Sequence, residues 1–155
     1  TDTYHDLRSS KLAKYDAWYG GVVSLHKAVD RLKSAGNSAF RSTEFEKAIE
    51  SYTEAIAVCD GRNVPVAPLH VLYANRAAAR LKIGQNEAAA EDAKSAVEWA
   101  PLWPKSHYRL ACAYRELGQF DDAKAALEHL LSLHPDNAMA QQELKDLTAR
   151  MAAVA

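Results

Sequence analysis

The chain lacks several features that mark other protein classes. It has two cysteines in 155 residues, Cys59 and Cys112, too few for a disulfide framework and not spaced as a C-x-x-C pair. We therefore expect a reduced, intracellular setting. No run of 18 apolar residues occurs, so the sequence offers no transmembrane helix. The net charge is only −1, which provides no overall field to draw the chain to nucleic acid or to a membrane.

Long runs of β-branched residues are also missing, whereas alanine is abundant, and this balance favours helices over strands. The first residues do not form a signal peptide. Because they also lack an initial Met, we expect a fragment of a longer protein, in which another domain could carry a second function.

Signs of catalysis are equally scarce. The sequence shows no phosphate-binding loop and no Ser/His/Asp or Cys/His arrangement that stands out. Its histidines have no metal-ligand spacing with cysteines or acidic residues and are expected on the surface or between packed helices: His26, His70, His107, His129 and His134. We expect no enzyme activity, no metal and no cofactor in this chain.

What the chain does contain is a repeat. Ala89 and Ala123 are 34 residues apart, and the same spacing separates Gly84-Gln85 from Gly118-Gln119. A period of this length is typical of stacked helical hairpins. Ala48 occupies the equivalent place in an earlier repeat, 41 residues before Ala89. The seven additional residues are expected in the loop Asp60–Pro68, which contains glycine and proline.

Apolar spacing and Gly/Pro punctuation predict two helices in each repeat. The predicted segments are Val29–Cys59 with a turn at 42–44, then 67–82 and 86–99, and finally 104–117 and 120–133. Ala48, Ala89 and Ala123 are expected where the two helices of a hairpin cross, because only a small side chain fits there.

Aromatic residues are expected mainly inside the stack. Tyr52, Phe45, Tyr73, Tyr114 and Phe120 are assigned to the core rather than to a ligand site. Trp99 and Trp103 flank Pro101 and are expected to join the second repeat to the third.

Both ends of the chain look helical. Residues 138–151 carry one apolar stripe and suit a helix that covers the last repeat. Residues 10–33 are helix-prone but interrupted at Gly20-Gly21. Their apolar residues, Tyr15, Trp18, Tyr19, Val22 and Val23, could cap the first repeat or belong to an interface with a part of the protein outside this chain, and the sequence does not decide between the two.

Five polar residues follow the repeat: Lys33, Asn37, Asn75, Lys105 and Arg109. Lys33 and Asn37 are spaced i, i+4, and so are Lys105 and Arg109, which places the members of each pair about 6 Å apart on one helix face. First helices of successive hairpins line the concave side of a stack. Because Asn lowers helix propensity in mid-helix, two such residues beside cations indicate a binding wall that suits a carboxylate.

The repeats resemble the tetratricopeptide repeat family. The resemblance covers about Val29 to Asn137, and it rests on the mid-hairpin alanines and the following residues: Gly36-Asn37, Ala77-Ala78, Ala111-Cys112, Tyr52, Tyr114, Phe45, Phe120, Pro101 and Pro135. Thr43 and Asp60 depart from it, since they replace the usual turn glycine and closing proline of the first repeat.

The resemblance implies an all-α, right-handed superhelix of three hairpins. The implied domains are an N-terminal helical extension (1–28), three repeats (29–60, 70–101 and 104–137, together 29–137) and a C-terminal capping helix (138–155).

The five polar residues are also similar to those of a subset of this family, the co-chaperone domains with a carboxylate clamp. Those domains bind the C-terminal Glu-Glu-Val-Asp tails of Hsp90 and Hsp70, and each clamp position carries the family's residue type here. The resemblance implies the same partners for this chain, in the cytoplasm. Lys82 would extend the cationic surface toward upstream Glu residues of the tail, while Phe40 and Ala78 would contact its penultimate Val.

Two alternatives stay open at this point. The repeats could bind a different partner, through the outer surface or the Asp60–Pro68 loop. They could also be the targeting domain of a larger enzyme, such as a prolyl isomerase, a phosphatase or a ubiquitin ligase. The sequence does not fix the preferred chaperone or the oligomeric state.

Overall fold

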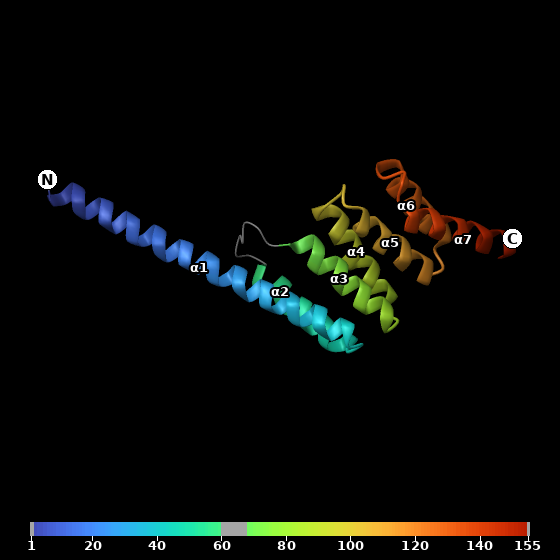
Figure 1. The fold of residues 1–155 in the computed structure, drawn as a ribbon, viewed down its shortest axis with the longest axis horizontal. Coiled ribbons are helices and arrows are strands. Elements are labelled where there is room, and N and C mark those ends of the chain that lie inside the picture. Colours follow the sequence, from blue (N-terminus) through green and yellow to red (C-terminus); the bar gives the residue numbers. More distant parts are fainter. Residues whose placement is uncertain (1, 60–67, 155) are drawn as a thin grey trace.

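The computed structural model describes residues 2–59 and 68–154, with side chains from residue 6 onward, and these residues form seven α-helices (Figure 1). The helices are α1 (Asp2–Arg41), α2 (Phe45–Cys59), α3 (Leu69–Lys82), α4 (Asn86–Trp99), α5 (Pro104–Glu116), α6 (Phe120–Leu133) and α7 (Ala138–Val154). The expected all-α class is confirmed. The loop at 60–67, where we placed the additional seven residues, lies outside the described residues.

The helices pack in sequence as three hairpins, α1–α2, α3–α4 and α5–α6, with α7 against α6. Helix α3 also contacts α1 and α5 directly, so the first helices of the hairpins form one inner row. The predicted bounds of α4 and α6 are confirmed. Both helices begin after a glycine turn and end before a proline, which cannot continue a helix.

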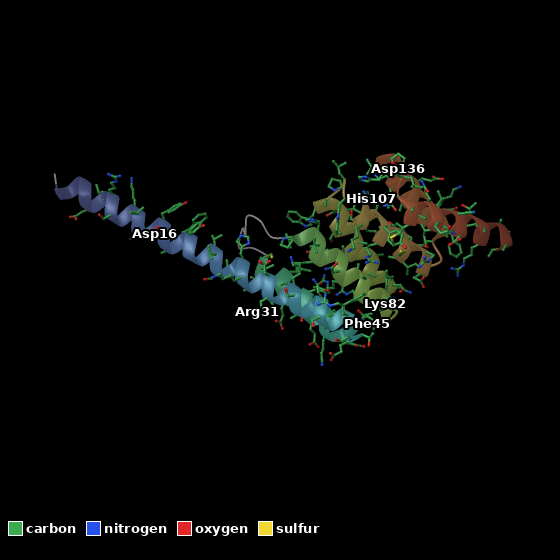
Figure 2. The ribbon with its side chains drawn as sticks, viewed as in Figure 1. Asp16, Arg31, Phe45, Lys82, His107 and Asp136 are labelled. Atoms are coloured by element: carbon green, nitrogen blue, oxygen red, sulfur yellow. The ribbon has the colours of Figure 1, made fainter. Side chains whose placement is uncertain are left out.

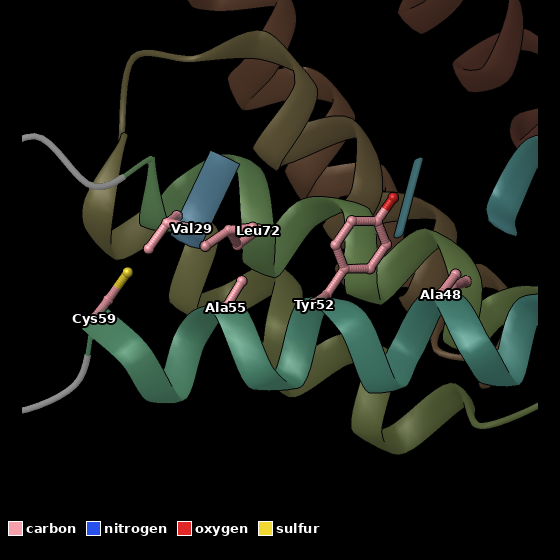
Figure 3. Packing of buried hydrophobic residues seen from close by; sticks show 7 residues of the cluster. Val29, Ala48, Tyr52, Ala55, Cys59 and Leu72 are labelled. Atoms are coloured by element: carbon pink, nitrogen blue, oxygen red, sulfur yellow. The ribbon is translucent and has the colours of Figure 1, made fainter. Parts of the chain in front are cut away.

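Small residues set how closely the paired helices approach. Ala48, Ala89 and Ala123 are fully buried, as expected from their place at the crossings. In the first hairpin, Tyr52 packs with Val29, Ala55 and Leu72 in a continuous core (Figure 3). A Cβ on Gly36 would lie 2.5 Å from the Tyr52 ring, so only glycine allows this approach of α1 to α2.

All three hairpin turns share one backbone geometry. Gly84 and Gly118 have φ values of 77° and 73°, and Thr43 has a φ of 61° in the turn that lacks glycine. The next residue in each turn donates its N–H to a carbonyl five residues earlier: Glu44 to Ala39, Gln85 to Arg80 and Gln119 to Tyr114. This hydrogen bond and the left-handed residue define the same helix C-terminal motif, so the first repeat makes the family turn with a threonine.

The junction between the second and third hairpins is held by polar contacts. The buried His107 ring donates from Nε2 to the Pro101 carbonyl at 2.6 Å, and Ser106 Oγ donates to the Trp103 carbonyl at 2.7 Å. Trp103 packs edge-to-face on His70 of α3, with ring centroids 4.9 Å apart, and therefore joins the two repeats as expected. The same expectation for Trp99 is wrong, because that side chain is 61% exposed.

An ion-pair cluster that sequence reasoning missed joins α3 to α4. Asp92 is 3% exposed, and its carboxylate accepts hydrogen bonds from Arg76 at 2.6 Å and Arg80 at 2.7 Å. Arg76 and Arg80 are spaced i, i+4, so both reach the same acid from one face of α3. The buried charge is thereby paired on both sides.

Helix α1 corrects the expectation for the N-terminal region. It runs as one helix of 40 residues through Gly20 and Gly21, where we predicted an interruption. A Cβ at either glycine would meet nothing within 4 Å, so no close neighbour requires these glycines and no turn forms there. Tyr15, Trp18 and Tyr19 are each more than half exposed, so they do not cap the first repeat.

Candidate functional site

A pocket of about 270 Å³ opens on the inner row of helices. Helices α1, α3 and α5 supply most of its wall, and α2 adds the Tyr52 ring from behind. Its lining residues are Asn37, Phe40, Arg41, Tyr52, Asn75, Ala78, Lys105 and Arg109. Four of the five polar residues singled out in the sequence therefore meet in one place, although they come from three hairpins.

The two asparagines are linked by hydrogen bonds at the floor of the pocket. Asn37 Oδ1 accepts from the Tyr52 hydroxyl at 2.6 Å and from Asn75 Nδ2 at 3.2 Å. Burial raises the pKa of Tyr52, which keeps the phenol protonated as the donor in this contact. Because the oxygen of Asn37 is occupied on the protein side, its NH₂ group remains as a donor for a ligand, as does the second N–H of Asn75.

The cations of the pocket are not neutralised by the protein. Among the described residues, no carboxylate oxygen lies within 4 Å of Arg41, Lys105 or Arg109. Arg109 Nε is also buried without a hydrogen-bond partner in that part of the chain. A ligand carboxylate in the pocket would meet cationic donors that carry no competing acid, which is the situation in which charge-assisted hydrogen bonds contribute most.

Lys33 does not line this pocket. It lies one turn before Asn37 on α1, and its Nζ is 4.0 Å from Asp30 Oδ1, at the outer limit of an ion pair. Its side chain is 29% exposed. Lys33 is therefore a neighbour of Asn37 on α1 that lies outside the central pocket.

The groove continues in both directions from the pocket. On one side, a space of about 350 Å³ shares Phe40, Ala78 and Arg109 with the pocket and brings in Lys82; Figure 2 marks Lys82 on α3. On the other side, a more apolar space of about 330 Å³ shares Lys105 and Arg109 and is lined by Trp103 and Met139, among others. Lys82 therefore lies along the groove but outside the central pocket.

Sequence reasoning missed two contributors. Arg41 follows Asn37 at i+4, so the spacing Lys33–Asn37–Arg41 could have revealed it. Tyr52 was assigned to the core and is indeed 1% exposed, yet its hydroxyl orients the central asparagine. That role depends on a partner 15 residues away, for which the local pattern holds no signal.

The chain is also similar to known proteins. The tetratricopeptide repeat model matches residues 104–137. The chain is 38% identical over 126 residues to the wheat (Triticum aestivum) Hsp70-Hsp90 organizing protein. The aligned residues cover 81% of this chain and 20% of that protein. In general, the chain spans about a fifth of the length of the first curated relatives that it matches.

Solved structures of similar domains include complexes with peptides. The second TPR domain of human RPAP3, in complex with the HSP70 peptide SGPTIEEVD, has a TM-score of 0.71 and 35% identity over 80% of this chain and 98% of that one. The second TPR of Spaghetti (RPAP3), bound to the HSP90 peptide SRMEEVD, has a TM-score of 0.65 and 32% identity over 77% and 98% of the two chains. Within residues 2–59 and 68–154 of the present chain, no helix is long and apolar enough to span a membrane.

Proposed function

The chain belongs to the tetratricopeptide repeat family and is closely related to co-chaperone domains of Hsp70 and Hsp90, and on this premise we propose that it is an adaptor that binds their C-terminal Glu-Glu-Val-Asp tails. The observation that carries the proposal is the central pocket, where amide and cationic donors from three hairpins converge without an acidic partner. A free C-terminal Asp offers two carboxylates to such a pocket. The partners imply a cytoplasmic location for the adaptor.

We assign the donors by their place in the groove. The main-chain carboxylate of the terminal Asp binds Asn37 and Asn75, with Lys33 at the rim. The side-chain carboxylate binds Lys105 and Arg109 on α5. Each charge-assisted hydrogen bond contributes roughly 1.5–3 kcal/mol. Three or four of them, less the cost of ordering a flexible tail, give a micromolar affinity, which corresponds to about −8 kcal/mol.

The upstream part of the tail follows the groove toward Lys82. Phe40 and Ala78 line both the central pocket and the adjoining space, so they can contact the penultimate Val. Lys82 then meets the Glu residues that precede it. Arg41 adds a further cation at the central pocket and has the same chemistry as the assigned donors.

Calorimetric titration tests the proposal. A peptide that ends in Met-Glu-Glu-Val-Asp should bind with micromolar affinity, and the same peptide with an amidated C-terminus should bind at least tenfold more weakly, because the amide removes one charge and one acceptor. Lys105→Ala and Arg109→Ala should each produce a similar loss. Lys145→Ala, an exposed lysine of α7 outside the groove, is the matched control and should bind like the unmodified chain. Equal binding of the free and amidated peptides would contradict a carboxylate clamp.

A second candidate function keeps the same binding role, with the chain as the targeting domain of a larger enzyme. The chain spans only about a fifth of its first curated relatives, so the adaptor can serve as the targeting part of a longer protein whose other domains act on the chaperone or on its clients. The titration does not separate the two readings, whereas the activity of the complete protein on a chaperone-bound substrate, with and without Arg109→Ala, does.

A further inference from the structure

Arg41 is a cation of the central pocket, and no carboxylate of the tail is yet matched to it. It lies one turn after Asn37, at the end of α1. Of the three spaces along the groove, Arg41 lines the central one alone, whereas its neighbour Phe40 also lines the space toward Lys82. On the proposed function, on which this inference rests, Arg41 therefore faces the terminal Asp of the tail rather than the residues that precede it.

Arg41 lies on the side of the pocket that α1 and α2 form. Burial raises the pKa of Tyr52, and the nearby charge of Arg41 opposes that rise, so the guanidinium is close enough to act on the phenol. The same hydroxyl donates to Asn37 Oδ1 at 2.6 Å. Arg41 and Asn37 therefore share one wall, whereas Lys105 and Arg109 belong to α5, which follows α3 in the inner row.

The charge of Arg41 is available to a ligand. Among the described side chains, no carboxylate oxygen lies within 4 Å of its guanidinium. The acid nearest to it in the sequence is Glu44, which pairs with Lys47 instead. A carboxylate that enters the pocket therefore meets no competing acid at Arg41, and a charge-assisted hydrogen bond can form there.

The backbone around Arg41 is held in place although its side chain is exposed. Phe40 packs edge-to-face on Phe45, with ring centroids 5.3 Å apart, and Figure 2 marks Phe45 at the start of α2. In the turn that follows, Glu44 donates its N–H to the Ala39 carbonyl at 2.9 Å. Only the side chain of Arg41 therefore has to be ordered when a ligand binds, which limits the entropic cost of the contact.

The main-chain carboxylate of the tail carries a charge, whereas the amides assigned to it are neutral. Hydrogen bonds from Asn37 and Asn75 contribute less than hydrogen bonds from a cation. Lys33 lies outside the pocket, with its Nζ 4.0 Å from Asp30 Oδ1. Arg41 is thus the cation that α1 contributes to the wall of the pocket.

We propose that Arg41 binds the main-chain carboxylate of the terminal Asp, together with the amides of Asn37 and Asn75. The planar guanidinium offers paired N–H groups that match the two oxygens of a carboxylate. The clamp then has cations on both sides of the terminal residue, with Arg41 for the main-chain carboxylate and the α5 pair, Lys105 and Arg109, for the side-chain carboxylate. The preference for a free C-terminus depends mainly on Arg41.

A cycle of mutation and peptide amidation, measured by calorimetry, tests this assignment. The free peptide should bind the unmodified chain at least about tenfold more tightly than the amidated peptide, and Arg41→Ala should shrink that ratio about fivefold, because both changes remove the same contact. Arg41→Lys keeps the charge and should keep most of the ratio. Lys105→Ala should weaken both peptides and leave their ratio unchanged. Arg31→Ala, at an exposed arginine of the same helix outside the groove, is the matched control and should change neither affinity.

An unchanged ratio in Arg41→Ala would overturn the assignment even if both peptides bound more weakly, because Arg41 would then act on another charge or only stabilise the end of α1 as a helix-terminal cation. A peptide with both Glu residues replaced by Gln tests the first of these. The loss in Arg41→Ala should persist with that peptide, and a loss that disappears would assign Arg41 to a Glu and overturn the proposal. Equal binding of the free and amidated peptides to the unmodified chain is a different result, which would remove the clamp itself and the role of Arg41 with it.

Discussion

At the scale of single residues, Tyr52 belongs to the core and to the groove at once. Its ring occupies the space that Gly36 leaves open, and its hydroxyl holds Asn37 in the orientation that turns the amide NH₂ group toward the pocket. Packing on one side thus fixes a hydrogen-bond donor on the other. Tyr52 thus orients Asn37 without itself binding the carboxylate of the ligand.

Replacing Tyr52 with Phe should therefore weaken peptide binding by about as much as it weakens the fold. The ring is kept, so unfolding should cost only about 1 kcal/mol less, the value of one buried hydrogen bond. Asn37 loses its strongest fixed partner, and we expect peptide affinity to fall about three- to tenfold, which is about 0.7–1.4 kcal/mol. Chemical denaturation and calorimetry measure the two effects. An affinity equal to that of the unmodified chain would show that Asn75 alone orients Asn37.

Thr43 is a second residue whose backbone conformation has a consequence. It has a φ of 61°, a region that disfavours β-branched side chains. Thr43→Gly should raise the free energy of unfolding by about 0.5–1 kcal/mol, the relief of left-handed strain less the greater chain entropy of glycine. The reverse change in the equivalent turn, Gly84→Thr, should lower it by about 1–2 kcal/mol. Urea denaturation of the two variants provides the test. A lower free energy of unfolding for Thr43→Gly would show that the left-handed conformation of Thr43 does not strain the turn.

At the scale of helices, the α3–α4 hairpin depends on one buried acid. Asp92 pairs with Arg76 and Arg80, whose side chains are only 12% and 20% exposed. Around this cluster the contacts between the two helices are mostly alanine, with Ala77, Ala89 and Ala93 fully buried. Alanine buries little apolar area per residue, so the ion pairs give this hairpin its specific geometry.

Asp92→Asn should lower the stability of the chain by about 3 kcal/mol, because it leaves two largely buried guanidinium groups without a counter-charge. Glu91→Ala is the control next in sequence. It removes a surface ion pair with Lys94 and should change stability by no more than about 0.5 kcal/mol. Thermal and urea unfolding report both changes. A similar small effect for the two variants would mean that the arginines find other partners.

The crossings of the hairpins provide a third test at this scale. Ala89 is fully buried between α3 and α4, so Ala89→Leu should overpack the crossing and cost about 1–3 kcal/mol. An unchanged melting midpoint would show that the helices can move apart freely.

At the scale of the whole molecule, charge is distributed unevenly over a nearly neutral protein. The net charge is −1, whereas the central pocket gathers Arg41, Lys105 and Arg109, none of which has a carboxylate oxygen within 4 Å among the described residues. The proposed peptide contacts are therefore ionic.

Added salt should therefore weaken peptide binding. Raising the ionic strength from about 0.05 M to about 0.5 M shortens the screening length severalfold, so peptide affinity should fall by roughly tenfold. Calorimetry at both salt concentrations measures this change. Peptide binding that ignores salt would contradict an ionic clamp.

The sequence by itself determined the features that depend on neighbours within a few residues. The bounds of α4 and α6, the buried alanines and the spacing of Lys105 with Arg109 all follow from helical periodicity, glycine turns and proline stops. These are local effects, so one window of sequence contains their cause. The repeat then indicated which helices form one wall, and four of the five expected residues do meet in one pocket.

Tertiary structure decided what depends on residues far apart in the chain. Tyr52 and Asn75 reach Asn37 across 15 and 38 residues. Asp92 joins two arginines of another helix, and Lys33 lies outside the pocket although it is one helical turn from Asn37. The continuity of α1 through Gly20 and Gly21 was also not predictable, since the cost of two glycines is small compared with the hydrogen bonds of a long helix. Local propensity weighs single residues, whereas these outcomes depend on which surfaces the packed helices bring together.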